Sequence, residues 1–169
     1  AGLEYTGALK VLQMIFSYEY LWIQIRVKGG AYGCMCSFSD QGDSMFVTYR
    51  DPNLSESYKV YDEAADYVED FDADDRDMKK YIIGTIGSMD MPMEAVDMGA
   101  RSFHAYFLGK TEADLQKVRD QVLSCTQEDI RALAPIVKAV VEAGNRCCIG
   151  NEEKIDQNKE YFDEVKHVL

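Results

Sequence analysis

Apolar residues near the start of the chain recur at helical spacing and then give way to a pair of glycines. They are Leu9, Leu12, Ile15, Phe16, Trp22 and Ile23. This spacing predicts an amphipathic helix from about residue 3 to residue 25. Gly29 and Gly30 follow, and glycines placed just past a helix commonly end it. We therefore expect a long helix that stops at a flexible bend.

The pattern changes from helical to strand-like after this bend. Residues 33–38 and 44–50 are short runs of strand-favouring composition, and the turn-forming residues 40–43 lie between them. This arrangement predicts an antiparallel hairpin. The segment Asp51–Asn53 is expected to close the second strand and to cap a helix over residues 54–69.

Most of the remaining chain carries helix signals. Further helices are expected over residues 74–86, from Pro92 to about Phe107, and after the capping-box-like starts Thr111–Asp114 and Thr126–Asp129. Pro135 is expected to kink or split the last of these. A short buried strand at residues 146–149 and a final helix over residues 159–168 complete the prediction.

The predicted strands and helices do not alternate one by one. This order favours the α+β class, with a small, mainly antiparallel sheet and several helices packed on one face. The 169 residues are expected to form a single domain. Three strands make a thin sheet, and the chain begins at Ala1 without Met. Either the fold is small, or strands that preceded Ala1 are missing and the chain is a piece of a longer polypeptide.

The formal net charge of −12 limits the partners of the chain. Nucleic acids and anionic membranes are bound by clustered Lys and Arg, so neither is expected as a partner. No run of about 18 apolar residues is present to span a membrane. The five cysteines are an odd number at adjacent or alternate spacings, unlike a disulfide framework. They predict reduced, buried thiols in a cytoplasm-like compartment.

Several motif-like stretches lack the features of the sites that they resemble. Residues 29–33 follow a helix and precede a strand, the reverse of a phosphate-binding loop. The acidic run 70–77 lacks the glycine and the final glutamate of a calcium loop, so it is expected to cap and solvate a helix start. His104 lies among aromatic residues, and Glu164 with His167 forms only one of the pairs that a carboxylate-bridged metal site needs.

The cysteines do not match a zinc site either. Structural zinc sites usually place two to four residues between paired cysteines, whereas here the pairs are adjacent or alternate. No metal site is therefore expected within the chain.

Arg26 and Tyr32 stand on either side of the glycine bend. A guanidinium and a phenol hydroxyl held near one point suit hydrogen bonding to peptide carbonyls, and the glycines let the backbone approach a ligand closely. The alternative is that Arg26 caps its helix and Tyr32 packs at the sheet edge. The small neighbours Ala31 and Gly33 leave space around the Tyr32 ring, which favours the binding role.

Four parts of the chain resemble one protein family. Residues 21–33 resemble the signature of the C-terminal half of insulinase-like zinc metallopeptidases, specifically of their presequence-protease branch. The resemblance continues, in order, at Tyr49–Leu54, Ile82–Gly87 and Thr126–Leu133. It therefore covers most of the chain.

The resemblance implies a metallohydrolase-like two-layer sandwich, here lacking its first strands, and a part in proteolysis. In this family four homologous domains form two halves around a chamber, and the first domain carries zinc on a His-x-x-Glu-His motif. The last domain contributes an Arg and a Tyr that reach the substrate. By this resemblance Tyr32 would donate to the scissile carbonyl as it becomes an oxyanion, and Arg26 would hold a neighbouring carbonyl. Gly29 and Gly30 would belong to the same substrate-binding segment.

The chain departs from the whole enzyme because it contains no His-x-x-Glu-His motif. We therefore expect the C-terminal, non-zinc domain of a zinc metalloendopeptidase that degrades unfolded peptides. The domain would be inactive alone and would need no cofactor, while zinc would be bound in the full-length enzyme. The alternative is a non-catalytic scaffold or binding subunit of the same fold, and a zinc motif upstream of Ala1 would distinguish the two.

The expected partners follow from the resemblance. They are a peptide substrate and the N-terminal, zinc-bearing half of the same enzyme. Unpaired sheet edges would also favour a homodimer of the fragment. The expected location is the cytoplasm of a bacterium, or an organellar matrix in a eukaryote.

Overall fold

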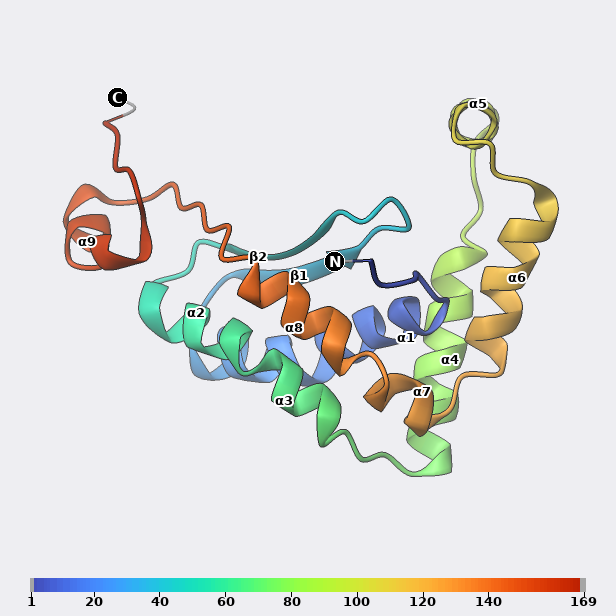
Figure 1. Cartoon of the computed structure of the whole chain (residues 1–169), viewed down its shortest axis with the longest axis horizontal. Coiled ribbons are helices and arrows are strands. Elements are labelled where there is room, and N and C mark those ends of the chain that lie inside the picture. Colours follow the sequence, from blue (N-terminus) through green and yellow to red (C-terminus); the bar gives the residue numbers. More distant parts are fainter. Residues whose placement is uncertain (1, 168–169) are drawn as a thin grey trace.

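The computed structural model describes residues 2–167 of the chain. Its elements are α1 (Ala8–Ile15), η1 (Phe16–Tyr20), η2 (Trp22–Lys28), β1 (Gly33–Phe38), β2 (Ser44–Tyr49), α2 (Leu54–Asp62), α3 (Ala64–Glu69), α4 (Asp75–Met89), α5 (Ala95–Phe107), α6 (Glu112–Leu123), α7 (Gln127–Arg131), α8 (Ala134–Glu142), α9 (Glu152–Asp156) and η3 (Lys159–Tyr161). Helices and one two-stranded sheet make this an α+β fold, as the sequence predicts (Figure 1).

The first three elements form one helical run from residue 8 to residue 28. It begins in α-helical geometry and continues in the wider π-helical turns of η1 and η2. Such π-helical turns are uncommon and often occur at functional sites. The predicted first helix is confirmed, although it starts later than residue 3 and runs three residues beyond residue 25.

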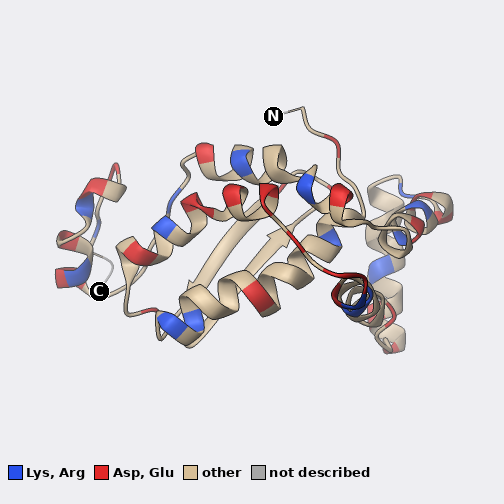
Figure 2. Cartoon of the chain, turned by 90° about the horizontal axis from the view of Figure 1, so that it is seen from below, with Lys and Arg blue, Asp and Glu red and all other residues tan. Residues whose placement is uncertain are grey.

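The hairpin packs on this helical run through one face of its two strands. β1 pairs antiparallel with β2, with Gly33 opposite Tyr49 and Phe38 opposite Ser44. Cys36 and Phe38 are buried, whereas Met35 and Ser37 are exposed, as alternation along a strand requires. Helices cover only one side of the sheet in Figure 1, and Figure 2 shows the charged residues on the helices and loops rather than on the strands.

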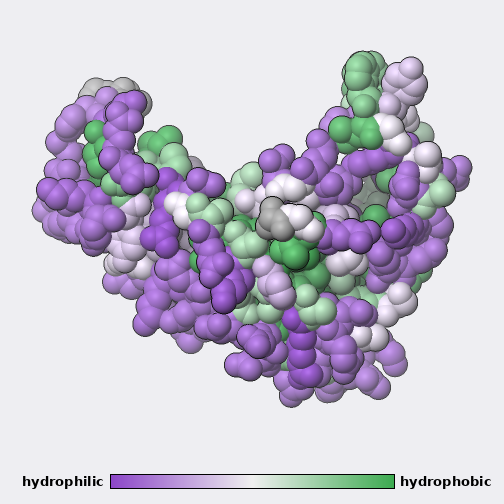
Figure 3. Space-filling model, in the orientation of Figure 1, coloured by the Kyte–Doolittle hydropathy of each residue, from purple (hydrophilic) through white to green (hydrophobic). Residues whose placement is uncertain are grey.

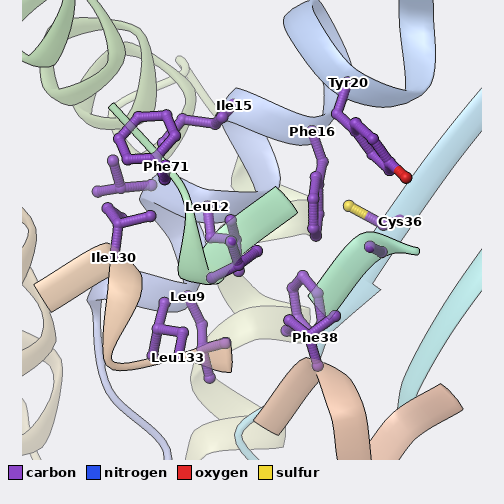
Figure 4. Packing of buried hydrophobic residues seen from close by; sticks show 14 of the residues in the cluster. Leu9, Leu12, Ile15, Phe16, Tyr20, Cys36, Phe38, Phe71, Ile130 and Leu133 are labelled. Carbon is purple, nitrogen blue, oxygen red and sulfur yellow. The ribbon is translucent and has the colours of Figure 1, made fainter. Parts of the chain in front are cut away.

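The core forms where the helical run, the hairpin and the following helices meet (Figure 4). Phe16 is fully buried, and its ring lies 5.7 to 6.3 Å from the rings of Tyr20, Phe38, Phe46 and Tyr67. Aromatic rings at such distances pack favourably beyond their buried area. Ile25 and Ala31, which flank the bend at the end of η2, belong to the same buried core.

The local helix signals are confirmed with two adjustments, the first being that Asn53 at the start of α2 forms no side-chain cap hydrogen bond. Thr111 and Thr126 each form a reciprocal capping box, at the starts of α6 and α7. Pro135 lies in the first turn of α8 and separates it from α7. The helix expected over residues 54–69 is divided at Glu63 into α2 and α3.

Two predictions for the C-terminal part are wrong. Residues 145–151 form no strand, and Ile149 is 89% exposed. Among the described residues β1 pairs with β2, and neither strand pairs with this segment. The helix predicted for residues 159–168 is reduced to the short 3-10 turn η3, with residues 162–167 not helical. Residues 163–167 are exposed and bury no apolar face, which is what usually stabilises so short a helix. Val168 and Leu169 lie outside the described residues.

The prediction of buried thiols holds for only two of the five cysteines. Cys36 and Cys125 are buried, Cys34 and Cys148 are half-buried, and Cys147 is exposed. The exposure of Cys147 follows from the missing strand at residues 146–149.

The helix α5 projects from the body beyond α4 and α6 (Figure 1). None of its residues is buried, and Figure 3 shows apolar residues gathered on it. The helix predicted to end near Phe107 is thus confirmed, but it packs on little else in residues 2–167. Within that range no helix combines the length and the apolar character needed to cross a membrane.

Candidate functional site

The bend between η2 and β1 is fixed by main-chain hydrogen bonds and by two glycines. Gly29 N–H donates to the carbonyl of Gln24 over 3.1 Å, and Ala31 N–H donates to that of Ile25 over 3.2 Å. A Cβ on Gly29 would lie 2.5 Å from the Ile25 oxygen. Gly30 has a φ of 79°, which L side chains rarely adopt. The bend therefore needs glycine at both positions.

Arg26 lies on the last turn of η2 and packs on an aromatic ring. Its guanidinium carbon is 3.9 Å from the centroid of Trp22, a close cation–π contact. Burial raises the pKa of the Cys34 thiol, and the positive charge of Arg26 offsets part of that rise. Trp22 and Cys34 are among the residues that line an open groove of about 770 Å³, together with residues of α1, α4 and α6. Arg26 therefore packs on a residue that lines this groove.

Tyr32 lies just after the bend and is 66% exposed. Its ring meets that of Tyr49 edge-on, with centroids 5.9 Å apart and an interplanar angle of 79°. The guanidinium of Arg50 is 5.9 Å from the Tyr32 ring centroid. Within residues 2–167 the phenol hydroxyl of Tyr32 has no hydrogen-bond partner, so it is free to donate to a ligand.

The structure brings Arg26 and Tyr32 to the same helix–strand junction but not into contact. No hydrogen bond or ring contact between them occurs in the described part of the chain. Gly29 and Gly30, which were also predicted to bind substrate, are needed for the backbone conformation of the bend. The main-chain carbonyl of Gly29 already accepts a hydrogen bond from the Asn53 side chain.

A second segment, Arg50–Asn53, completes the site, although the sequence predicted only that Asp51–Asn53 closes a strand and caps a helix. Tyr32 N–H donates to the carbonyl of Arg50 over 3.3 Å. Asp51 accepts hydrogen bonds from the Asn53 N–H over 2.9 Å and from the Ser57 hydroxyl over 2.6 Å. The succession Asp-Pro-Asn signals a turn. Its contact with the glycine bend is long-range, so no local pattern reveals it.

The described residues do not form a metal site. No three His, Cys, Asp or Glu side chains in residues 2–167 are grouped so that they could hold a metal ion. In the acidic run, the Asp74 carboxylate accepts from the N–H groups of Arg76 and Asp77 over 2.9 and 2.8 Å at the start of α4. This confirms the interpretation of that run as a helix cap.

Comparison with known proteins agrees with the resemblance seen in residues 21–33. The family described as PreP C-terminal domain matches residues 1–151. The chain belongs to the PreP C-terminal domain family. This family membership indicates a peptidase-associated domain, and the glycine bend with Arg26 and Tyr32 lies inside the matched range.

Several full-length relatives contain a segment similar to this PreP C-terminal domain. Protein HypA of Clostridium perfringens is 41% identical over 168 residues, which are 99% of this chain and 17% of HypA. Presequence protease 1, chloroplastic/mitochondrial, of Arabidopsis thaliana is 33% identical over 172 residues, which cover 99% of this chain and 16% of that protein. The mitochondrial presequence protease of Aspergillus fumigatus is 34% identical over 151 residues, with coverage of 88% and 14%. The chain thus spans only a small part of the length of these relatives.

Proposed function

We propose that this chain is the substrate-clamping C-terminal domain of a zinc metalloendopeptidase that cleaves unfolded peptides. Tyr32 donates a hydrogen bond to the scissile carbonyl oxygen as negative charge develops on it. Arg26 donates to a neighbouring carbonyl of the same peptide. The observation that carries the proposal is the exposed, unpartnered phenol of Tyr32 on a fixed bend, in a chain whose relatives are named presequence proteases.

The local geometry suits such a role. A donor that is already in place when charge develops costs no reorganisation during the reaction, and losing one such donor typically lowers the rate by about 100- to 1000-fold. The ring of Tyr32 is restrained by Tyr49 and Arg50. The guanidinium of Arg26 is restrained by Trp22, and no carboxylate in residues 2–167 pairs with it. Both donors are therefore partly ordered before a peptide arrives.

The proposal assigns the attack on the carbonyl to another part of the full-length enzyme. The described residues do not fit a metal ion, so this chain would supply only hydrogen-bond donors and charge. Zinc and the general base would belong to the N-terminal half, as the resemblance implies. The partners of the chain would then be the peptide substrate and that half.

The test is the substitution Tyr32→Phe in the full-length enzyme, which removes one hydroxyl and leaves the ring packing intact. We expect kcat for an internally quenched, unstructured peptide to fall by about tenfold or more, with an unchanged denaturation midpoint. Tyr106→Phe is a matched control, because Tyr106 is also exposed but lies on α5. Unchanged turnover in Tyr32→Phe would remove the assigned role. A wild-type enzyme with no peptidase activity would instead support the non-catalytic scaffold.

A further inference from the structure

Arg50 has an unusual backbone conformation beside the candidate site. Its φ of 48° is left-handed, and among residues 2–167 no other non-glycine residue has a positive φ. Side chains with a Cβ rarely adopt this region, and such residues persist where the surrounding structure holds them. They cluster at sites of function. The left-handed backbone of Arg50 is therefore expected to be held by contacts with its neighbours.

Arg50 contacts Tyr32 through both its main chain and its side chain. Its carbonyl accepts the Tyr32 N–H over 3.3 Å. Its guanidinium carbon lies 5.9 Å from the Tyr32 ring centroid and 5.3 Å from that of Tyr49. Both distances are within the range of cation–π attraction. The left-handed turn thus lets one residue hold the backbone of Tyr32 and also cover its ring.

The turn that carries Arg50 is itself anchored. Asp51 accepts from the hydroxyl of Ser57, a buried residue in the first turns of α2. No carboxylate lies within ion-pair distance of Arg50 in the described residues, so its guanidinium has the two rings as its neighbours. The restraint on Tyr32 is therefore connected to the helical layer and not only to the exposed end of the hairpin.

The geometry points to Arg50 as the positioning residue of Tyr32. This inference rests on the proposed function. A phenol that rotates freely spends part of its time away from the developing oxyanion, and even small misplacement of a catalytic donor lowers the rate. Arg50 restrains the ring against such rotation without touching the peptide. Its loss should therefore change turnover rather than peptide binding.

The experiment uses the full-length enzyme and an internally quenched, unstructured peptide. We expect Arg50→Ala to lower kcat by about tenfold with KM changed less than about twofold. Arg50→Lys keeps a cation over the rings and should recover most of the loss. In the Tyr32→Phe background, Arg50→Ala should cause no further loss, because no hydroxyl remains to be positioned.

Arg146 provides a matched control. Its guanidinium also lies over two tyrosines, at 5.0 Å from Tyr58 and 5.3 Å from Tyr161, and it additionally pairs with Asp62 at the end of α2 over 2.9 Å. Arg146→Ala therefore removes a similar cation–π arrangement and should keep the wild-type kcat. Circular dichroism and denaturation midpoints report the folding of each variant. If Arg50→Ala does not fold, Arg50→Gly, which tolerates the left-handed backbone, replaces it in the same comparison.

The outcomes separate the two proposals. Wild-type turnover in Tyr32→Phe would overturn the proposed function, and with it any role in positioning that hydroxyl. A normal effect of Tyr32→Phe combined with wild-type kcat in Arg50→Ala would overturn only the positioning role. The positioning role alone would also be overturned if the losses from Arg50→Ala and Tyr32→Phe multiply in the double variant. It would likewise be overturned if Arg50→Ala raises only KM, or if Arg146→Ala lowers kcat as much as Arg50→Ala does.

Discussion

The side-chain amide of Asn53 donates a hydrogen bond to the main-chain carbonyl of Gly29. Gly29 ends the helical run and Asn53 precedes α2, so the bond joins segments on opposite sides of the hairpin. It ties the bend that carries Tyr32 to the turn that carries Arg50. The candidate site is therefore one connected unit, although its parts are separated in the sequence.

Asn53→Ala is expected to destabilise the chain by about 1–2 kcal/mol. The substitution leaves the half-buried carbonyl of Gly29 without its partner, and an unsatisfied buried acceptor costs roughly this amount. Urea denaturation, with the midpoint and slope fitted together, measures the change. Asn145→Ala is the matched control, because Asn145 is exposed and hydrogen-bonds to no side chain or main-chain group in residues 2–167. A loss in Asn145→Ala as large as that in Asn53→Ala would contradict the assigned cause.

Gly30→Ala and Gly87→Ala are expected to change stability in opposite directions. Gly30 has a φ of 79°, so alanine there is strained and should cost about 1 kcal/mol. Gly87 lies within α4, its φ is negative, and an added Cβ would meet nothing within 4 Å. Alanine there should stabilise the chain by about 0.5–1 kcal/mol, because glycine is a poor helix former. Thermal or urea unfolding of both variants checks the signs, and a stabilising Gly30→Ala would contradict the left-handed bend.

The sequence predicts those parts of the fold that local chemistry decides. The capping boxes at Thr111 and Thr126 and the split at Pro135 need only neighbouring residues, and all three are confirmed. The predicted strand at residues 146–149 is wrong because a strand also needs a pairing partner, and neither strand of the described residues, β1 or β2, pairs with this segment. Apolar composition alone does not form a strand.

The candidate site was predictable only in part, for a similar reason. The glycine bend is visible in the sequence, since helix periodicity stops where Gly29 and Gly30 begin. The contribution of Arg50 is not visible, because its contacts with Tyr32 depend on the hairpin register that places Gly33 opposite Tyr49. The stacking of Arg26 on Trp22 is a helical i, i+4 contact that the sequence allows but does not require.

Phe16→Ala is expected to be among the most damaging core substitutions, at about 3–5 kcal/mol. Phe16 is fully buried and its ring contacts four other aromatic rings, so truncation leaves a cavity lined by the hairpin and the helices. Val27→Ala serves as the control, because Val27 is 66% exposed and should change stability by less than about 0.5 kcal/mol. Urea denaturation of both variants gives the comparison. A Phe16→Ala change below about 1 kcal/mol would mean that the core is not packed around this ring.

Two buried thiols should make the chain less stable at alkaline pH. Burial raises the pKa of Cys36 and of Cys125 to about 12, from an ordinary value of 9.0. The folded state therefore keeps these protons when the unfolded state has lost them. Their contribution to stability is fully present below about pH 9 and is lost as pH rises from 9 toward 12.

The expected result is a fall in the free energy of unfolding between pH 9 and pH 11, at up to about 1.4 kcal/mol per pH unit for each thiol. Urea midpoints at several pH values measure this slope, and Cys36→Ala should reduce it because that variant has one titrating thiol fewer. Iodoacetamide labelling at pH 8 provides a separate check. The exposed Cys147 should react first, and Cys36 and Cys125 should react only at the rate of unfolding. Rapid labelling of Cys36 in the folded chain, or an unchanged slope in Cys36→Ala, would show that this thiol is not buried as described.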